Sequence, residues 1–210
     1  MPLSRIDSVY IKKDVFDRYY QGDILRDIKI VEWADEVYVE EEIKGETHKE
    51  KNIEIRERII PYSVIITQDC DLEQDYNNRI NKESTDNDKY IHTILLCQAH
   101  LSEKLRGGAH LEDLSIKTRS IPSVEWKQLR QNNIYRYHSL EEASDLQIPS
   151  LVIDFKHYFS ILRDILYTDE YSNKRIATIS ALFRDNLSIR YAQYLSRIGL
   201  PDFPKLPQVV

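Results

Sequence analysis

The sequence predicts a single domain of mainly β to α+β class, in which a small curved sheet is closed by one C-terminal helix. Short segments rich in β-branched and aromatic residues recur between Gly22 and Ser180. The chain has 14 tyrosines but only 5 glycines and one methionine, which is typical of a β-rich body. Residues 181–198 carry an apolar stripe at spacings of three and four, which indicates the helix.

The first half of the chain contains four predicted strands, at residues 24–33, 36–43, 53–60 and 62–68. We expect Ala34 and Asp35 to form a tight connection between the first two strands. The polar segment 44–52 is predicted to be the exposed tip of a hairpin. Pro61 separates the last two strands, because proline has no N–H group to donate to a sheet.

An Asp-Cys-Asp sequence at residues 69–71 follows the apolar strand 62–68. We interpret it as an acidic turn, in which the aspartates bond to nearby backbone groups. The polar segment 73–89 is predicted to be a mobile loop, and the next strand covers 90–97. We expect strands 62–68 and 90–97 to lie side by side as antiparallel neighbours.

The second half of the chain is less regular. Its predicted elements are a helix at 123–131, strands at 134–138, 150–162 and 175–180, and the closing helix at 181–198. We expect barrel strands over approximately 22–98 and 134–180, with an irregular insertion over approximately 99–148. No internal repeat or linker divides the chain, so residues 1–210 are taken as one domain.

Composition and charge restrict the class of protein. Hydrophobic residues make up 41% and charged residues 30% of the chain, a balance typical of globular domains. The net charge of −6 gives no overall attraction to phosphate backbones, so nucleic-acid binding needs a local basic patch. Two cysteines make no disulfide framework, and no apolar run has the length of a signal or membrane segment. We predict a cytoplasmic protein with no membrane association and no cofactor.

Five segments resemble, in their order along the chain, the PemK/MazF toxin family of small SH3-like barrels. They are GDI at 22–24, IPYSVIITQD at 60–69, HTILLCQAH at 92–100, SLVIDFKHYFSI at 150–161 and RIATIS at 175–180. The resemblance implies an SH3-like barrel with a closing helix, and members of that family cleave single-stranded RNA without a metal. The family's arginine before the proline falls on Ile60, and its threonine after the next strand falls on His100. The resemblance therefore supports the barrel more directly than the activity.

The function that the resemblance implies is binding. We expect a prokaryotic barrel protein that binds a protein partner or single-stranded RNA in a toxin–antitoxin or phage-defence-type system. Cations interleaved with aromatic rings suit phosphate contact and base stacking. The residues assigned to this surface are Arg56, Tyr135, Arg136, Lys156 and Tyr158. Homodimerisation through strand edges is an open alternative.

Two enzymatic alternatives also stay open. A metal-independent endoribonuclease would have relocated its catalytic groups to Arg58 and His100, with His92 as a further group. A Cys70-dependent enzyme would pair its thiolate with the His92 ring. The carboxylates on either side of Cys70 raise the pKa of a thiol, which argues against a nucleophile at this position.

No metal site is predicted. Cys97 and His100 have half of a zinc-binding spacing, but no second pair of ligands stands at a suitable distance in the sequence. Residues three apart on a strand also point to opposite faces. We expect Cys97 in the core, and Asp23, Asp27 and Asp154 as surface or turn carboxylates.

Overall fold

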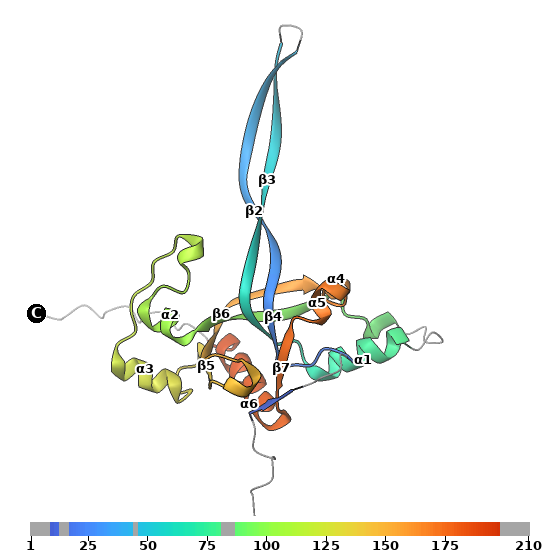
Figure 1. Cartoon of the computed structure of the whole chain (residues 1–210). Coiled ribbons are helices and arrows are strands. Elements are labelled where there is room, and N and C mark those ends of the chain that lie inside the picture. Colours follow the sequence, from blue (N-terminus) through green and yellow to red (C-terminus); the bar gives the residue numbers. More distant parts are fainter. Residues whose placement is uncertain (1–8, 13–16, 44–45, 81–86, 198–210) are drawn as a thin grey trace, which may run out of the picture.

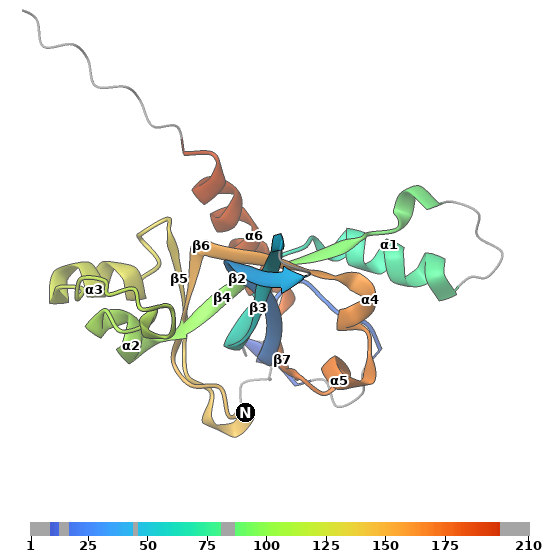
Figure 2. The same cartoon turned by 90° about the horizontal axis from the view of Figure 1, so that it is seen from above.

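The structure is a computed structural model that describes residues 9–12, 17–43, 46–80 and 87–197, with backbone alone for 34–43 and 46–53. Its body is a seven-stranded antiparallel sheet that curls into a half-barrel and is surrounded by helices (Figures 1 and 2). The strand order is β1-β7-β2-β3-β4-β6-β5. The strands are β1 (Tyr10–Ile11), β2 (Asp23–Ile43), β3 (Glu46–Ile65), β4 (Thr93–Leu101), β5 (Tyr137–Leu140), β6 (Leu151–Leu162) and β7 (Arg175–Ile179). The predicted combination of a β-sheet with helices is confirmed.

Strands β2 and β3 form a long two-stranded arm that rises from the sheet (Figure 1). Their pairing runs outward to Ile43 and Glu46. The predicted connection at Ala34 and Asp35 is wrong, because β2 passes through it with a shift in register after Trp33. Such a bulge bends a strand without ending it. Residues 46–52, predicted in the hairpin tip, belong to β3.

Strand β3 also passes through Pro61, where we predicted a break. In the pairing of β2 with β3, the residues before and after Pro61 have partners, but Pro61 and Asp27 are not paired with each other. Asp27 has a φ of +54°, a left-handed conformation that turns its backbone out of the ladder. The missing N–H of proline therefore removes no ladder bond at this point.

Strand β4 pairs with β3 in the antiparallel sense, through three residue pairs centred on Val64 and Cys97. The predicted neighbourhood of segments 62–68 and 90–97 is thus confirmed. Cys97 is fully buried, as predicted, because it lies in the middle of this central pairing. The strand then continues for four residues beyond Cys97, to Leu101.

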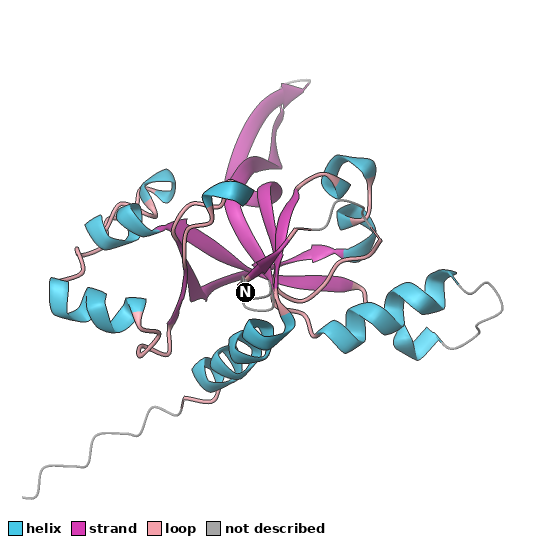
Figure 3. Cartoon of the chain, turned by 60° about the horizontal axis from the view of Figure 1, so that its bottom comes forward, coloured by secondary structure: helices cyan, strands magenta, loops and turns pink. Residues whose placement is uncertain are grey.

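Within the described residues, six helices cover the ends and one face of the sheet (Figures 2 and 3). They are α1 (Asp69–Ile80), α2 (Ser102–Gly107), α3 (Ser123–Arg130), α4 (Arg163–Leu166), α5 (Asp169–Ser172) and α6 (Ala181–Leu195), with 3-10 turns at Asn87–Lys89, Glu112–Leu114 and Ser144–Leu146. Helices α3 and α6 confirm the two predicted helices. Helices α2 and α3 lie beside β5, and α1, α4 and α5 lie at the opposite end of the sheet (Figure 2).

The predicted acidic turn at 69–71 is wrong, and so is the predicted loop where it covers residues 73–80, because residues 69–80 form helix α1. Residues 81–86 of that predicted loop lie outside the described residues. Carboxylates in the first turn of a helix are stabilised by the helix dipole. Asp69 also accepts hydrogen bonds from the Arg18 guanidinium and from the backbone N–H of Gln21, both at 3.2 Å. The aspartates thus stabilise the start of a helix.

Both faces of the sheet are buried at β4. Ile94 and Leu96 point to one side and pack in a cluster with Tyr19. Cys97 points to the other side, where Leu187 of α6 covers the sheet. The alternation of a strand accounts for this two-sided burial. Within the described residues, no helix is long and apolar enough to cross a membrane.

Candidate functional site

Three of the six histidines in the chain meet at the α2 end of the sheet: His100, His110 and His157. One ring nitrogen of each lies within 4.8 Å of the others. The Nε2 atom of His100 is 3.2 Å from Nδ1 of His157. The rings of His100 and His110 meet edge to face, with their centroids 4.8 Å apart. We call these three residues the histidine cluster.

An irregularity between β4 and β6 brings His157 to His100. The register shifts between Cys97 and Ala99, where residues 154–157 of β6 lie opposite Gln98 of β4. Bulges of this kind redirect side chains and recur next to functional sites. Here the extra residues carry both Asp154 and His157 to the same end of the sheet as His100.

A tight turn after α2 positions His110. The helix ends at Gly107, and the next residue, Gly108, has a φ of +81° and accepts a hydrogen bond from the Thr118 hydroxyl at its carbonyl oxygen. A Cβ atom at this position would lie 2.4 Å from the carbonyl oxygen of Thr118, so only glycine fits. The chain then carries His110 to the edge-to-face contact with His100.

Asp154 lies behind the cluster, where it is wholly buried, contrary to the predicted surface position. It accepts hydrogen bonds from Nε of Arg136 at 2.9 Å and from the backbone N–H of Lys156 at 3.0 Å. Its Oδ2 atom is 3.5 Å from Nδ1 of His157. Burial alone would raise the pKa of Asp154, but the Arg136 guanidinium and the neighbouring His157 hold this pKa below its ordinary value.

The histidine rings are neutral at neutral pH. Burial lowers the pKa of His100 to about 3, helped by the two neighbouring histidines. Burial also lowers the pKa values of His110 and His157. Neutral imidazole is the form that binds metal ions.

His110 has two buried ring nitrogens, Nδ1 and Nε2, and neither has a hydrogen-bond partner among the described residues. The side chain is only 9% exposed. Buried polar atoms in proteins nearly always have a partner, and each exception requires an explanation. A bound ligand or ion at this position would supply the partner.

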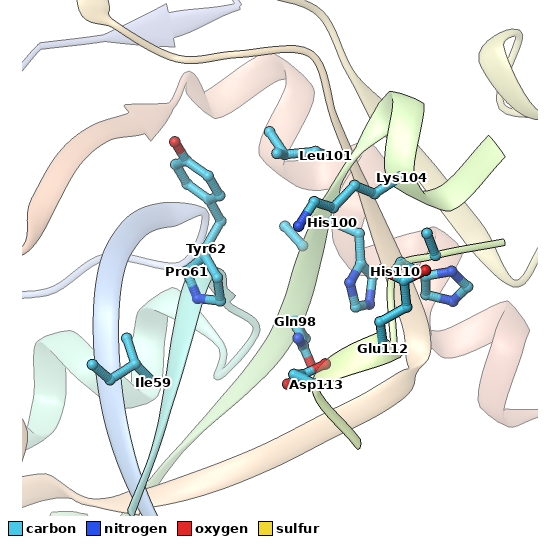
Figure 4. Close-up of a pocket in the computed structure, with 12 residues that line it drawn as sticks. Ile59, Pro61, Tyr62, Gln98, His100, Leu101, Lys104, His110, Glu112 and Asp113 are labelled. Atoms are coloured by element: carbon cyan, nitrogen blue, oxygen red, sulfur yellow. The ribbon is translucent and has the colours of Figure 1, made fainter. Parts of the chain in front are cut away.

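A cavity of about 170 Å³ opens beside the cluster (Figure 4). Pro61 and Tyr62 of β3 form one wall, and His100 of β4 lies across from them (Figure 4). Lys104 of α2 stands at one end of the cavity and Glu112 lies near His110. Solvent and a small substrate group therefore have access to the histidine cluster.

The geometry suits a divalent transition metal. Nitrogen ligands of a tetrahedral zinc ion lie about 3.4 Å from one another, as follows from Zn–N bonds of about 2.0–2.1 Å. His100 and His157 already have this separation. A shift of the His110 ring of up to about 1.4 Å, from 4.8 Å to about 3.4 Å, completes the set. The Oδ2 atom of Asp154 lies 3.5 Å from the same Nδ1 atom of His157 that faces His100, so its negative charge would lie beside the ion and favour its binding.

Of the predicted catalytic residues, His100 lines the cavity, and Arg58 lies next to it through Asp113 without lining it. The Arg58 guanidinium donates to Glu32 at 2.8 Å and to Asp113 at 3.4 Å, and Asp113 lines the cavity with His100. The positive charge of Arg58 also helps to lower the pKa of His157. Arg58 is thus tied to the site through acidic neighbours.

The other two predicted catalytic residues lie elsewhere. His92 is exposed and precedes β4, at the end of the strand away from His100. Cys70 is exposed in the first turn of α1, and its Sγ atom is 3.6 Å from side-chain oxygens of Gln68 and Asp71. Neither residue contacts the histidine cluster through a hydrogen bond within the described chain.

The residues predicted to bind RNA or a partner divide into two groups. Arg136 and Lys156 border Asp154, and therefore lie next to the histidine cluster. Arg56, Tyr135 and Tyr158 are exposed, and Arg56 pairs with Glu32 on the arm. Sequence reasoning did not identify His110, and it placed His157 on the candidate RNA-binding surface and Asp154 among surface or turn carboxylates, because no spacing between these residues matches a known motif.

Comparison with known proteins adds no relative: no protein-family model, curated protein or solved structure matches the chain.

Proposed function

We propose that the protein is a metal-dependent hydrolase, with a zinc ion held by His100, His110 and His157. The observation that carries the proposal is the convergence of three buried, neutral imidazoles, one of which has no other partner for either nitrogen. Three protein ligands leave one position of a tetrahedral ion open, which is the arrangement of catalytic rather than structural zinc sites.

The chemistry follows from the open position. Zinc lowers the pKa of a bound water to about 7, so that hydroxide forms at neutral pH. This hydroxide attacks the electrophilic atom of the substrate, and the bond from that atom to the leaving oxygen breaks. Glu112 lines the cavity and is the base that takes the proton from the water and returns it to the leaving oxygen.

Metal titration tests this proposal directly. The purified protein is treated with EDTA, dialysed, and titrated with Zn²⁺ by calorimetry and with Co²⁺ by visible absorption. We expect one ion per chain and the absorption bands of tetrahedral cobalt. His110→Asn and His157→Asn should weaken binding by more than about 100-fold. His92→Gln removes an exposed histidine outside the cluster and serves as the control.

The proposal fails if no ion binds stoichiometrically, or if His110→Asn and His92→Gln bind zinc equally well. Circular dichroism shows whether each variant is folded. His110 is the main test position because it follows a helix end, whereas His100 lies within a central strand.

The fold supports a second, separate role in partner binding. Four apolar side chains on the arm are exposed: Val31, Trp33, Ile55 and Ile59. Trp33 pairs with Ile55, and Val31 and Ile59 lie on the same face of the two strands. Contiguous exposed apolar surface of this kind marks protein interaction sites. We propose that this face binds a partner protein.

A toxin–antitoxin or phage-defence setting, with an SH3-like PemK/MazF-type barrel, stays part of this proposal. Its support is the order of the five matching segments and the curled antiparallel sheet. Co-expression with the products of the neighbouring genes tests it. We expect a complex that Trp33→Ser with Ile55→Ser abolishes, and that Leu182→Ser on α6 leaves intact, because Leu182 is equally exposed outside the arm.

A further inference from the structure

His110 borders a second cavity, of about 300 Å³, on the side of the cluster facing α3. Three arginines line this cavity: Arg119, Arg136 and Arg197. Pockets that hold small ligands begin at about this volume. The cavity is therefore large enough for a phosphate group and the sugar attached to it.

The charges around this cavity do not balance. Arg119 is paired with Glu125 at 2.8 Å, and Arg136 is paired with the buried Asp154. Arg197 donates from Nε to the carbonyl oxygen of Tyr194 and lies over the Tyr194 ring. Within the described residues, no carboxylate lies at ion-pair distance from Arg197. One positive charge is thus in excess.

The ring of His110 supplies the second observation. A histidine that binds a metal through one nitrogen usually donates its other N–H to a carboxylate, a carbonyl oxygen or a water. Both nitrogens of His110 are buried and have no such acceptor in the described chain. Because the ring borders both cavities, an anionic oxygen in the arginine-lined cavity would provide the acceptor.

We propose that the arginine-lined cavity is a phosphate-binding subsite, and that the substrate of the hydrolase carries a phosphodiester or phosphomonoester group. Guanidinium groups form paired hydrogen bonds with phosphate oxygens, which makes arginine well suited to this ligand. The inference rests on the proposed function, because the hydrolysis takes place at the ion. The phosphate that accepts from His110 lies across the ring from the ion, so it anchors the substrate and is not itself attacked.

Two sources of phosphate fit this chemistry, a free nucleotide and a single-stranded RNA. The experiment therefore has three probes: inorganic phosphate, adenosine monophosphate, and a five-nucleotide single-stranded RNA. Binding is measured by calorimetry with the full-length protein, once after treatment with EDTA and once with zinc added. A pentanucleotide that binds more tightly than the mononucleotide identifies RNA as the source, and equal affinities identify a nucleotide.

The variants are Arg119→Gln with Arg197→Gln, compared with Arg26→Gln as the control. Arg26 is exposed on β2 and is not among the residues that line either cavity. We expect the double variant to weaken phosphate binding by roughly ten- to a hundredfold, as the loss of charge-assisted hydrogen bonds does. Arg26→Gln removes the same type of charge and should leave the affinity unchanged.

The inference is overturned if none of the probes binds, or if the double variant and Arg26→Gln bind them equally. Its outcome is separable from that of the proposed function. Phosphate binding that depends on Arg119 and Arg197 in protein without zinc supports the subsite by itself. Zinc binding without phosphate binding overturns the subsite and leaves the metal centre in place.

Discussion

The Nε2 atom of His100 lies 3.2 Å from the Nδ1 atom of His157, although 57 residues separate them in the sequence. This contact depends on the irregular pairing of β4 with β6, where residues 154–157 lie opposite Gln98. Continuing the register of Ala99 and Ile153 without this shift would place His157 opposite Leu95, five residues from His100. The same irregularity brings the Oδ2 atom of Asp154 to this Nδ1 atom of His157, at 3.5 Å.

Asp154→Asn should weaken zinc binding by roughly 10- to 100-fold, because the carboxylate lies 3.5 Å from the Nδ1 atom of His157 that faces His100, and its negative charge would lie beside the ion. The change also removes the ion pair with Arg136. Competition between the protein and a chromophoric zinc chelator measures the effect. Asp145→Asn, on an exposed turn, is the control. Unchanged zinc affinity in Asp154→Asn would show that Asp154 does not contribute to metal binding.

Gly108→Ala should both destabilise the protein and weaken zinc binding. The residue has a φ of +81°, and its new Cβ would lie 2.4 Å from the Thr118 carbonyl oxygen, so the turn leading to His110 must move. A residue forced into such a conformation costs about 1–3 kcal/mol. Urea unfolding and zinc titration measure the two effects.

The adjacent glycine provides the matched control. A Cβ at Gly107 would meet nothing within 4 Å, and this residue is the last of α2. Gly107→Ala should therefore leave zinc binding unchanged and raise stability by about 0.4–1 kcal/mol, because alanine reduces the freedom of the unfolded chain. Equal effects of the two substitutions would contradict the positioning of His110 by this turn.

Asp75→Asn should destabilise the protein by about 3–5 kcal/mol, as the loss of one partner in a buried ion pair does. Asp75 is 1% exposed and accepts hydrogen bonds from Arg79 at 2.8 Å, Arg163 at 2.7 Å and the backbone N–H of Ile91 at 3.1 Å. It thereby joins α1 to the segments before β4 and after β6. Urea unfolding measures the loss, and Asp71→Asn, exposed in the first turn of the same helix, should cost no more than about 1 kcal/mol, the size of a helix-dipole contribution.

The elements that could be predicted from the sequence are those in which burial and periodicity agree. Strand β7 and helices α3 and α6 lie within two or three residues of their predicted bounds. Helix α1 was missed because its burial depends on Leu72 and Asp75 alone, so its sequence lacks an apolar stripe. The unbroken course of β3 through Pro61 could not be predicted either, because it depends on the left-handed backbone of Asp27 in the opposite strand.

The candidate site was predictable only in part. The antiparallel neighbourhood of β3 and β4 correctly places His100 beside Pro61 and Tyr62, because that follows from the pairing of two apolar segments. The positions of His110 and His157 depend on a helix end and on a shift in register. The helix end and the register shift depend on tertiary packing, which the spacing of apolar residues in the sequence does not reveal.

Asp23 predicts a pH dependence of stability with a definite sign. Burial raises its pKa to about 6, although hydrogen bonds from Thr178, Arg175 and the Tyr20 backbone act in the opposite direction. The unfolded chain has an aspartate pKa near 3.9, so the folded state binds more protons between about pH 4 and pH 6. Stability from this group therefore rises as the pH falls through this window, and is lost as the pH rises through 6.

Urea unfolding of the natural protein and of Asp23→Asn at pH 4.5, 5.5, 6.5 and 7.5 checks this sign. Other titrating groups, such as His138 with a pKa lowered to about 4 by burial, are present in both proteins and cancel in the difference. The free energy of unfolding of the natural protein relative to Asp23→Asn should increase by about 1–3 kcal/mol from pH 7.5 to pH 4.5. A difference that decreases on acidification would mean that Arg175 and Thr178 hold Asp23 in its charged form.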